Sequence, residues 1–126
     1  MAEPKARVLV VDDDDGIRTF AARALASGGY EVVTASDGPD ALRIVDARPR
    51  FDLFILDVMM PGMRGDELAR RLHDRDPDIK VLYFTGYADQ FTALRPMLRE
   101  NESVLVKPVT LKSFLEAVAQ RLRQRV

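Results

Sequence analysis

The chain has 126 residues, and its 19 basic and 20 acidic side chains leave a formal net charge of −1 at pH 7. This length corresponds to about one domain, and the balanced charge excludes a global basic field for nucleic acid or an anionic membrane. The chain contains no cysteine and a single histidine, which excludes disulfides, zinc fingers, iron–sulfur clusters, thiol catalysis and multi-histidine metal sites.

The first third of the chain predicts a strand, a helix and a second strand. The apolar run at 7–11 is short and rich in β-branched residues, as in a buried strand, and it stops at the aspartates 12–15. Apolar residues then recur with the spacing of one helix face, at Ile17, Phe20, Ala21, Ala24 and Leu25. Gly28 and Gly29 end this helix, and 31–35 is the second predicted strand.

The middle of the chain repeats this alternation. Asp37 precedes a second predicted helix as its N-cap, and that helix carries the apolar residues Ala41, Leu42 and Val45. The run 51–56 predicts a third strand, which ends at Asp57. After a loop that contains proline and glycine, a third helix carries Leu68, Ala69 and Leu72 on its apolar face. His73 is assigned to the polar face of this helix, where we expect it to be solvated.

The last third predicts two further strands and two further helices. The strands are 79–84 and 103–106. Between them, 87–100 has a helical pattern, which Pro96 should kink or split because proline removes a backbone donor. The final helix begins at about Thr110, and its expected buried stripe is Leu111, Phe114, Leu115, Val118 and Leu122.

Successive strand–helix units of this kind predict an α/β fold built on a parallel sheet. Strands that are apolar on both faces are typical of a sheet that helices cover on both sides. Right-handed crossovers would wind the chain into a doubly wound (βα)5 three-layer sandwich. We expect one domain over residues 1–126, with its core at about 6–124 and no output domain.

The sequence indicates neither a membrane span nor a targeting segment. No apolar run approaches the ~20 residues that a membrane-spanning helix needs. The first seven residues, 1–7, lack a hydrophobic signal region. We therefore expect a cytoplasmic protein with no membrane partner and no nucleic-acid partner.

Polar side chains stand at the carboxyl ends of four predicted strands, the edge at which open parallel sheets bind ligands. Asp12 and Asp13 follow the first strand, whereas Asp57, Thr85 and Lys107 follow the third, fourth and fifth strands. Two carboxylates ~5 Å apart repel by ~3 kcal/mol at an effective dielectric constant near 20. A divalent cation would offset this repulsion, and oxygen ligands beside a phosphate favour Mg²⁺.

Four short motifs give the chain a family resemblance. They are Val-Val-Asp-Asp at 10–13, Asp-Val-Met-Met-Pro-Gly-Met-Arg-Gly at 57–65, Thr85-Gly86 and Lys107-Pro108. In this order, each at the end of a predicted strand, they resemble the receiver domain of two-component response regulators over roughly residues 6–124. The resemblance implies a flavodoxin-like sheet with the parallel strand order 2-1-3-4-5.

The resemblance implies a phosphoacceptor and a metal site. Asp57 would be the phosphoacceptor and would form an acyl phosphate. Asp12 and Asp13 would bind Mg²⁺, for which Mn²⁺ could substitute. Asp57 and the backbone carbonyl of Met59 would complete the protein ligands of the metal.

The resemblance also implies how the site responds to phosphorylation. Lys107 would pair with Asp57 at rest and with the phosphoryl group after transfer, and its bond to Pro108 would be cis. Thr85 would swing toward a phosphoryl oxygen. This chain departs from the family at Val104, where an aromatic residue is usual, so the coupling of threonine movement to an aromatic rotamer is not expected in its familiar form.

The function implied is that of a signalling domain, not of an enzyme, beyond self-catalysed phosphoryl transfer and autodephosphorylation. A histidine kinase or a histidine phosphotransfer protein would donate the phosphoryl group. Transfer would switch the binding of a downstream protein to the face formed by the fourth helix, the fifth strand and the fifth helix. The expected oligomeric state is a monomer or a weak dimer.

Three alternatives stay open from the sequence. The chain could be a receiver module of a hybrid histidine kinase. It could also be a pseudo-receiver that binds partners without being phosphorylated, which is disfavoured because every pocket residue is present. It could also be a haloacid-dehalogenase-type phosphatase, because Asp13-Asp14-Asp15-Gly16 matches the Asp-x-Asp-Gly opening of that family. The phosphatase alternative is disfavoured because a cap domain does not fit in 126 residues and the strand-end Asp57 would have no role.

Overall fold

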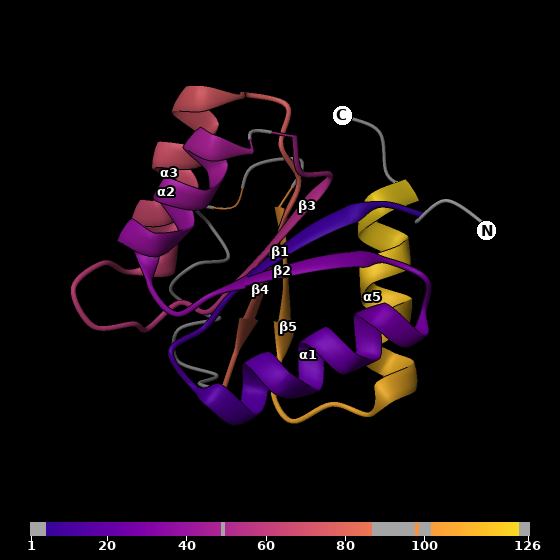
Figure 1. Ribbon diagram of the computed structural model, residues 1–126. Coiled ribbons are helices and arrows are strands. Elements are labelled where there is room, and N and C mark those ends of the chain that lie inside the picture. The colour runs from indigo at the N-terminus through magenta and orange to yellow at the C-terminus, as the bar shows by residue number, and fades with distance from the viewer. Residues whose placement is uncertain (1–4, 49, 87–97, 99–101, 124–126) are drawn as a thin grey trace.

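A parallel sheet of five strands lies between two layers of helices (Figure 1). The computed structural model describes residues 5–48, 50–86, 98 and 102–123. The strands are β1 (Arg7–Val11), β2 (Glu31–Ala35), β3 (Leu53–Leu56), β4 (Val81–Thr85) and β5 (Glu102–Val106). The helices found in these residues are α1 (Asp15–Ser27), α2 (Gly38–Ala47), α3 (Gly65–Arg75) and α5 (Leu111–Arg123). None of these helices is long and apolar enough to cross a bilayer.

The strand order is β2-β1-β3-β4-β5 and every neighbouring pair is parallel, which confirms the predicted fold class and strand order. The third and fourth strands begin later than predicted. Phe51 and Ile79 open the two apolar runs and are buried, but they precede the hydrogen-bonded strands. An apolar run in the sequence thus indicates which residues are buried, and it can be longer than the strand that pairs by backbone hydrogen bonds. The helix predicted at 87–100, with its kink at Pro96, lies outside the described residues.

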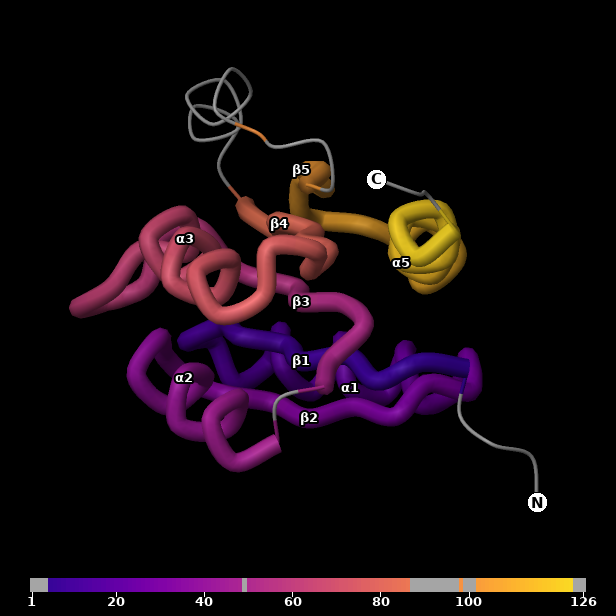
Figure 2. The backbone as a smooth tube through the Cα atoms, turned by 90° about the horizontal axis from the view of Figure 1, so that it is seen from above, coloured from indigo at the N-terminus to yellow at the C-terminus, as the bar shows by residue number. Residues whose placement is uncertain are grey.

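Alternate residues of each strand serve two separate hydrophobic clusters, one on each face of the sheet. Leu9 and Val11 of β1 pack in the cluster that joins the sheet to α2 and α3. Val8 and Val10 pack in the cluster that joins it to α1 and α5. Figure 2 shows α3 and α5 on opposite sides of the strands. The side-chain alternation of a strand therefore produces the three layers.

The ends of the first two helices follow from local chemistry. Asp14 is the N-cap of α1 and its Oδ1 accepts a hydrogen bond from the Ile17 amide, at 3.1 Å. Asp37 caps α2 in the same way, as predicted from its place before the apolar run. After α1, Gly29 has φ +91°, a conformation that a residue with a side chain adopts only with strain.

The prediction that His73 is solvated was wrong. His73 is 4% exposed, and its Nε2 lies 2.8 Å from Oε2 of the buried Glu102 at the start of β5. The buried residues of α3 are Gly65, Leu68, Ala69, Leu72 and His73. His73 therefore continues the apolar stripe of the helix, and a hydrogen-bonding partner distant in sequence allows a polar ring to be buried there.

The buried stripe of the last helix is also shorter than predicted. Phe114 and Val118 are fully buried, but Leu111 is 50% exposed. Leu111 is the first residue of α5 and lines an apolar hollow together with Phe20 and Ala24 of α1. The helical spacing identifies the buried face of α5 correctly. It does not show at which residue of the helix the segments packed against that face end.

Candidate functional site

Backbone pairing brings the predicted site residues to one edge of the sheet. The amide of Asp57, which follows β3, donates to the carbonyl of Val11 at the end of β1, at 2.9 Å. The amide of Lys107, which follows β5, donates to the carbonyl of Thr85 at the end of β4, at 2.7 Å. Since all five strands are parallel, every strand end that carries a predicted site residue faces the same way.

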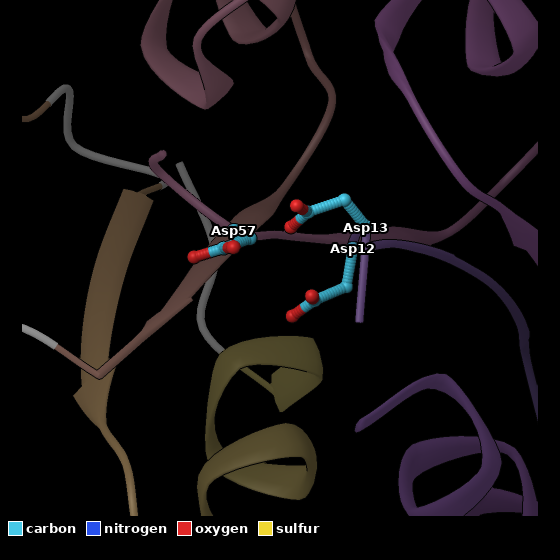
Figure 3. Close-up of side chains that lie close together, drawn as sticks. All are labelled: Asp12, Asp13 and Asp57. Atoms are coloured by element: carbon cyan, nitrogen blue, oxygen red, sulfur yellow. The ribbon is translucent and has the colours of Figure 1, made fainter. Parts of the chain in front are cut away.

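Asp12, Asp13 and Asp57 form a cluster of carboxylates at this edge. One oxygen atom from each side chain lies within 4.8 Å of the others. Figure 3 shows the three side chains extending from neighbouring strand ends into the same space. Asp12 and Asp57 are buried, whereas Asp13 is exposed. The cluster therefore combines two carboxylates held by the fold with one that solvent reaches.

Asp12 is the most constrained of these carboxylates. It is 2% exposed, its Oδ1 accepts a hydrogen bond from the Asp14 amide at 2.9 Å, and its Oδ2 lies 2.9 Å from Nζ of Lys107. The same Nζ is 3.9 Å from Oδ1 of Asp57. Lys107 is therefore shared between both buried carboxylates and lies closer to Asp12 than to Asp57, the residue with which the resemblance implied a pairing. Its bond to Pro108 is cis, as the resemblance implied.

The surroundings of Asp57 favour its protonated form. Burial raises the pKa of Asp57 from 3.8 to about 6, and the charge of Asp12 adds to this increase. The ammonium of Lys107 lowers the same pKa but only partly compensates. The Asp57 carboxylate is consequently ionised near neutral pH and poorly stabilised, which leaves it ready to bind a cation or to act as a nucleophile.

Two other predicted residues are less completely defined by their contacts. Thr85 is buried at the end of β4, next to the amide of Lys107. Met59 is 45% exposed, and its sulfur lies 3.3 Å from Nη1 of Arg64. The role of the Met59 carbonyl as a metal ligand stays a prediction.

Sequence reasoning missed Arg18, a residue of α1 that reaches this site. Its Nη1 donates a hydrogen bond to the backbone carbonyl of Asp12 at 2.6 Å, and its Nη2 pairs with Asp15. The spacing between Asp15 and Arg18 puts both residues on one helix face, which was a signal available in the sequence. The contact with the Asp12 carbonyl depends on the turn between β1 and α1 and could not be read from spacing.

The donor set fits a hard divalent cation. All three clustered ligands are carboxylates, and oxygen ligands are the ones that Mg²⁺ binds in proteins. The two buried carboxylates share the ammonium of Lys107, so the three carboxylates and this lysine together carry an excess of negative charge. A cation bound between the three carboxylates would neutralise this excess.

Neutralising Asp57 should stabilise the protein without metal, and increasingly so as the pH rises. The folded-state pKa of about 6 lies above the ordinary value of 3.8, so between these values the native state binds the proton more strongly than the unfolded chain. The unfolding free energy of the wild type should therefore fall relative to Asp57→Asn across this range, by about 1–3 kcal/mol.

Urea unfolding in EDTA from about pH 4 to about pH 8 measures this difference, because the pH profile follows the linkage between protonation and folding. Adding Mg²⁺ near neutral pH should reduce the difference in unfolding free energy between the two proteins, because the cation would stabilise the ionised Asp57. A gap between the two proteins that stays constant over the whole range would contradict the raised pKa of Asp57.

Comparison with known proteins identifies one family. The family described as response regulator receiver domain matches residues 8–119. The response regulator receiver protein CpdR of Brucella abortus is 36% identical over 118 residues, which cover 92% of this chain and 96% of CpdR. The sensor kinase CckA of the same organism is also 36% identical, over 95% of this chain but only 13% of CckA. Relatives of this chain thus include a protein of similar length and a segment of a much longer kinase.

Solved structures agree with this result. The response regulator protein TrrA of Thermotoga maritima, solved in complex with Mg²⁺ and BeF, has a TM-score of 0.82 and 32% identity, and the match covers 92% of this chain and 98% of TrrA. The receiver domain from the hybrid histidine kinase CckA has a TM-score of 0.79 and 35% identity, over 93% and 99% of the two chains. Since the sequence and the fold agree over most of its length, this chain belongs to the response regulator receiver domain family of two-component systems.

Proposed function

We propose that this receiver domain accepts a phosphoryl group on Asp57 and thereby switches its binding to another protein. Receiver domains are signalling domains that interact with histidine kinases and downstream partners, and they bind a divalent metal at an acidic cluster. The observation that carries the proposal is the buried Asp57 carboxylate, which belongs to such a cluster and lies 3.9 Å from Nζ of Lys107.

Asp12, Asp13 and Asp57 would hold Mg²⁺ together with the carbonyl of Met59, and Mn²⁺ could substitute. The cation would supply charge neutralisation, so that an anionic phosphoryl donor can approach the ionised Asp57. The oxygen donor set supports this assignment. The similar protein TrrA was solved in complex with Mg²⁺ and BeF, which is consistent with a metal and a phosphoryl-like group occupying this kind of site.

In the proposed transfer, a carboxylate oxygen of Asp57 attacks the phosphorus of a phosphohistidine on the partner protein. The new O–P bond forms as the P–N bond breaks, and the electron pair of the P–N bond returns to the imidazole nitrogen, which then takes a proton. The products are an acyl phosphate on Asp57 and a free histidine. The attacking carboxylate must be ionised, and a cation bound at the cluster would favour this form against the burial that raises the pKa of Asp57.

Lys107 and Thr85 would stabilise the transferred group. The Lys107 ammonium already lies between Asp12 and Asp57, so a short movement of its side chain would bring it to a phosphoryl oxygen. The hydroxyl of Thr85 would donate to a second phosphoryl oxygen. Autodephosphorylation would follow when water attacks the same phosphorus and releases inorganic phosphate.

The phosphoryl group itself carries ~1.5–2 negative charges, and its capture by Lys107 and Thr85 would bias the end of β5 toward an active arrangement. Val104 of β5 is only partly buried and packs against the core cluster that contains Tyr83. Val104 has no aromatic ring whose rotamer could change, so we propose that the movement of the β4 and β5 ends itself alters the face formed by the predicted fourth helix, β5 and α5. Of this face, β5 and α5 lie in the described residues.

The partner that donates the phosphoryl group would be a histidine kinase or a histidine phosphotransfer protein. The similarity to CpdR, of which the match covers 96%, is consistent with a response regulator built on a receiver domain. The similarity to CckA is consistent with a receiver module of a hybrid kinase. In both arrangements the chemistry at Asp57 is the same, and we expect the domain to be a monomer or a weak dimer.

Phosphorylation by a small-molecule donor tests the proposal. The wild type, Asp57→Asn and the control Asp74→Asn, which changes an exposed carboxylate of α3, would be incubated with acetyl phosphate with and without Mg²⁺. We expect a Mg²⁺-dependent gain of one phosphoryl group in the wild type and in the control, read by intact mass, and no gain in Asp57→Asn. Beryllofluoride binding supplies a stable analogue of the phosphorylated state.

Absence of both phosphorylation and beryllofluoride binding in the wild type would overturn the phosphoacceptor function and favour a pseudo-receiver. Retention of the phosphoryl gain by Asp57→Asn would place the acceptor elsewhere. The haloacid-dehalogenase alternative would then be favoured if peptide mass mapping found the phosphoryl group on Asp13.

A further inference from the structure

Arg18 closes the turn that carries the acidic cluster. The chain leaves β1 at Asp12, turns through Asp13 and Asp14, and enters α1, from which the Arg18 side chain returns to the start of the turn. There its Nη1 donates to the carbonyl of Asp12 at 2.6 Å. The Arg18 side chain is only 20% exposed, and its Nη2 pairs with Asp15, whose side chain is 91% exposed. Arg18 thus bridges the first residue of the turn to the first residue of the helix.

The carbonyl that Arg18 binds belongs to the peptide bond between Asp12 and Asp13. A peptide unit is planar, so a hydrogen bond to its oxygen restricts the rotation of the whole unit. The other polar atoms of Asp12 are also engaged: its amide with the carbonyl of Ala35, and its carboxylate with Asp14 and Lys107. Arg18 supplies the remaining constraint on the backbone that joins the two carboxylates.

Asp13 depends on this constraint more than its neighbours do. It is exposed, and among the described residues no hydrogen bond holds its carboxylate. Its direction is therefore determined mainly by the backbone to which it is attached. A change in the plane of the Asp12–Asp13 peptide would carry the Asp13 carboxylate away from the position within 4.8 Å of Asp57.

We propose that Arg18 is a positioning residue for the metal site, which holds the Asp12–Asp13 peptide so that the two carboxylates meet a divalent cation together. This inference rests on the proposed function, because it requires that the cluster bind Mg²⁺. Groups that orient metal ligands without touching the metal commonly contribute 10–100-fold to affinity, by reducing the rearrangement that binding requires.

Because Arg18 is positively charged, the direction in which Mg²⁺ affinity changes when Arg18 is replaced tests the inference. A guanidinium beside the cluster repels a metal cation, so if charge were its main contribution, removing it would strengthen Mg²⁺ binding. If positioning is its contribution, removing it weakens Mg²⁺ binding although a positive charge has been lost. The pairing of Arg18 with the exposed Asp15 already offsets part of its charge, which favours the second outcome.

The experiment compares Arg18→Met with the matched variant Arg23→Met, which changes an exposed arginine of the same helix. Mg²⁺ affinity would be measured by calorimetry, with Mn²⁺ binding followed by electron paramagnetic resonance as a second readout. We expect the dissociation constant of Arg18→Met to increase about 10-fold and that of Arg23→Met to stay at the wild-type value. Arg18→Lys, which retains the charge and one donor group, should recover part of the loss.

Thermal unfolding of the same variants in EDTA separates positioning from a general loss of stability. Binding would be measured well below the unfolding temperature, where each variant is folded. A wild-type or tighter Mg²⁺ affinity in Arg18→Met would overturn the inference, whatever its unfolding temperature. If the wild type itself fails to bind Mg²⁺, the proposed metal site fails and this inference fails with it, a result distinct from a wild type that binds and an Arg18→Met that binds equally well.

Discussion

Replacement of Gly65 by alanine should destabilise the protein by about 3 kcal/mol and displace Asp57 from its site. A Cβ atom at position 65 would lie 2.0 Å from the carbonyl oxygen of Asp57 and 2.9 Å from its carbonyl carbon. Both atoms belong to the backbone directly after β3, so no side-chain rotation relieves the overlap. The Gly65 amide also donates to the carbonyl of Val58 at 2.8 Å, which holds the start of α3 against this segment.

The same overlap should impair phosphorylation. To make room for a methyl group, either α3 moves away from the sheet or the peptide after Asp57 rotates, and both changes alter the relation of this carboxylate to Asp12 and Lys107. We therefore expect Gly65→Ala to show a lower urea midpoint and slower Mg²⁺-dependent phosphorylation by acetyl phosphate under conditions in which it is folded.

Gly86→Ala is the control for this substitution. A Cβ there would meet its nearest atom, Cδ of Lys107, at 3.8 Å, an ordinary van der Waals distance. Its urea midpoint should stay close to that of the wild type. Equal midpoints for Gly65→Ala and Gly86→Ala would contradict the close approach of α3 to the backbone of Asp57.

Glu102→Leu should destabilise the protein by about 1–3 kcal/mol. Glu102 and His73 form a buried hydrogen-bonded pair, with side-chain exposures of 4% and 3%. Nδ1 of His73 has no hydrogen-bond partner in the described part of the chain, so the substitution leaves both ring nitrogens without one. A buried polar ring that loses its hydrogen bond retains the full cost of its desolvation.

A double-mutant cycle separates the interaction energy between His73 and Glu102 from the contribution that each side chain makes by itself. Glu102→Gln keeps the shape and an acceptor oxygen, so it should lose less stability than Glu102→Leu. The double substitution of His73 and Glu102 by leucine removes both polar groups, and apolar replacements of buried pairs are often nearly neutral. We expect the double variant to unfold at higher urea concentration than Glu102→Leu alone. Additive losses in the cycle would show that the two residues act independently.

Several features of this protein could be predicted from the sequence because they depend on local patterns. The apolar runs indicated the strands, and the helical spacing indicated α1 and α3. Asp37 caps α2 as its position before the apolar run suggested, because capping needs only a short side chain and amides a few residues away. The alternation of strands and helices then determined the layers, and it brought the strand-end residues Asp12, Asp57 and Lys107 to one edge.

Other features were decided only by the tertiary structure, because they depend on contacts between distant segments. His73 follows a stripe that any apolar residue could continue, and its burial depends on Glu102, 29 residues away. The nearer contact of Lys107 with Asp12 than with Asp57 reflects a difference between 2.9 and 3.9 Å, which no spacing along the chain can resolve. Local patterns specify which groups reach the edge of the sheet, but the packing of the segments determines the distances between them, and the chemistry of the site depends on those distances.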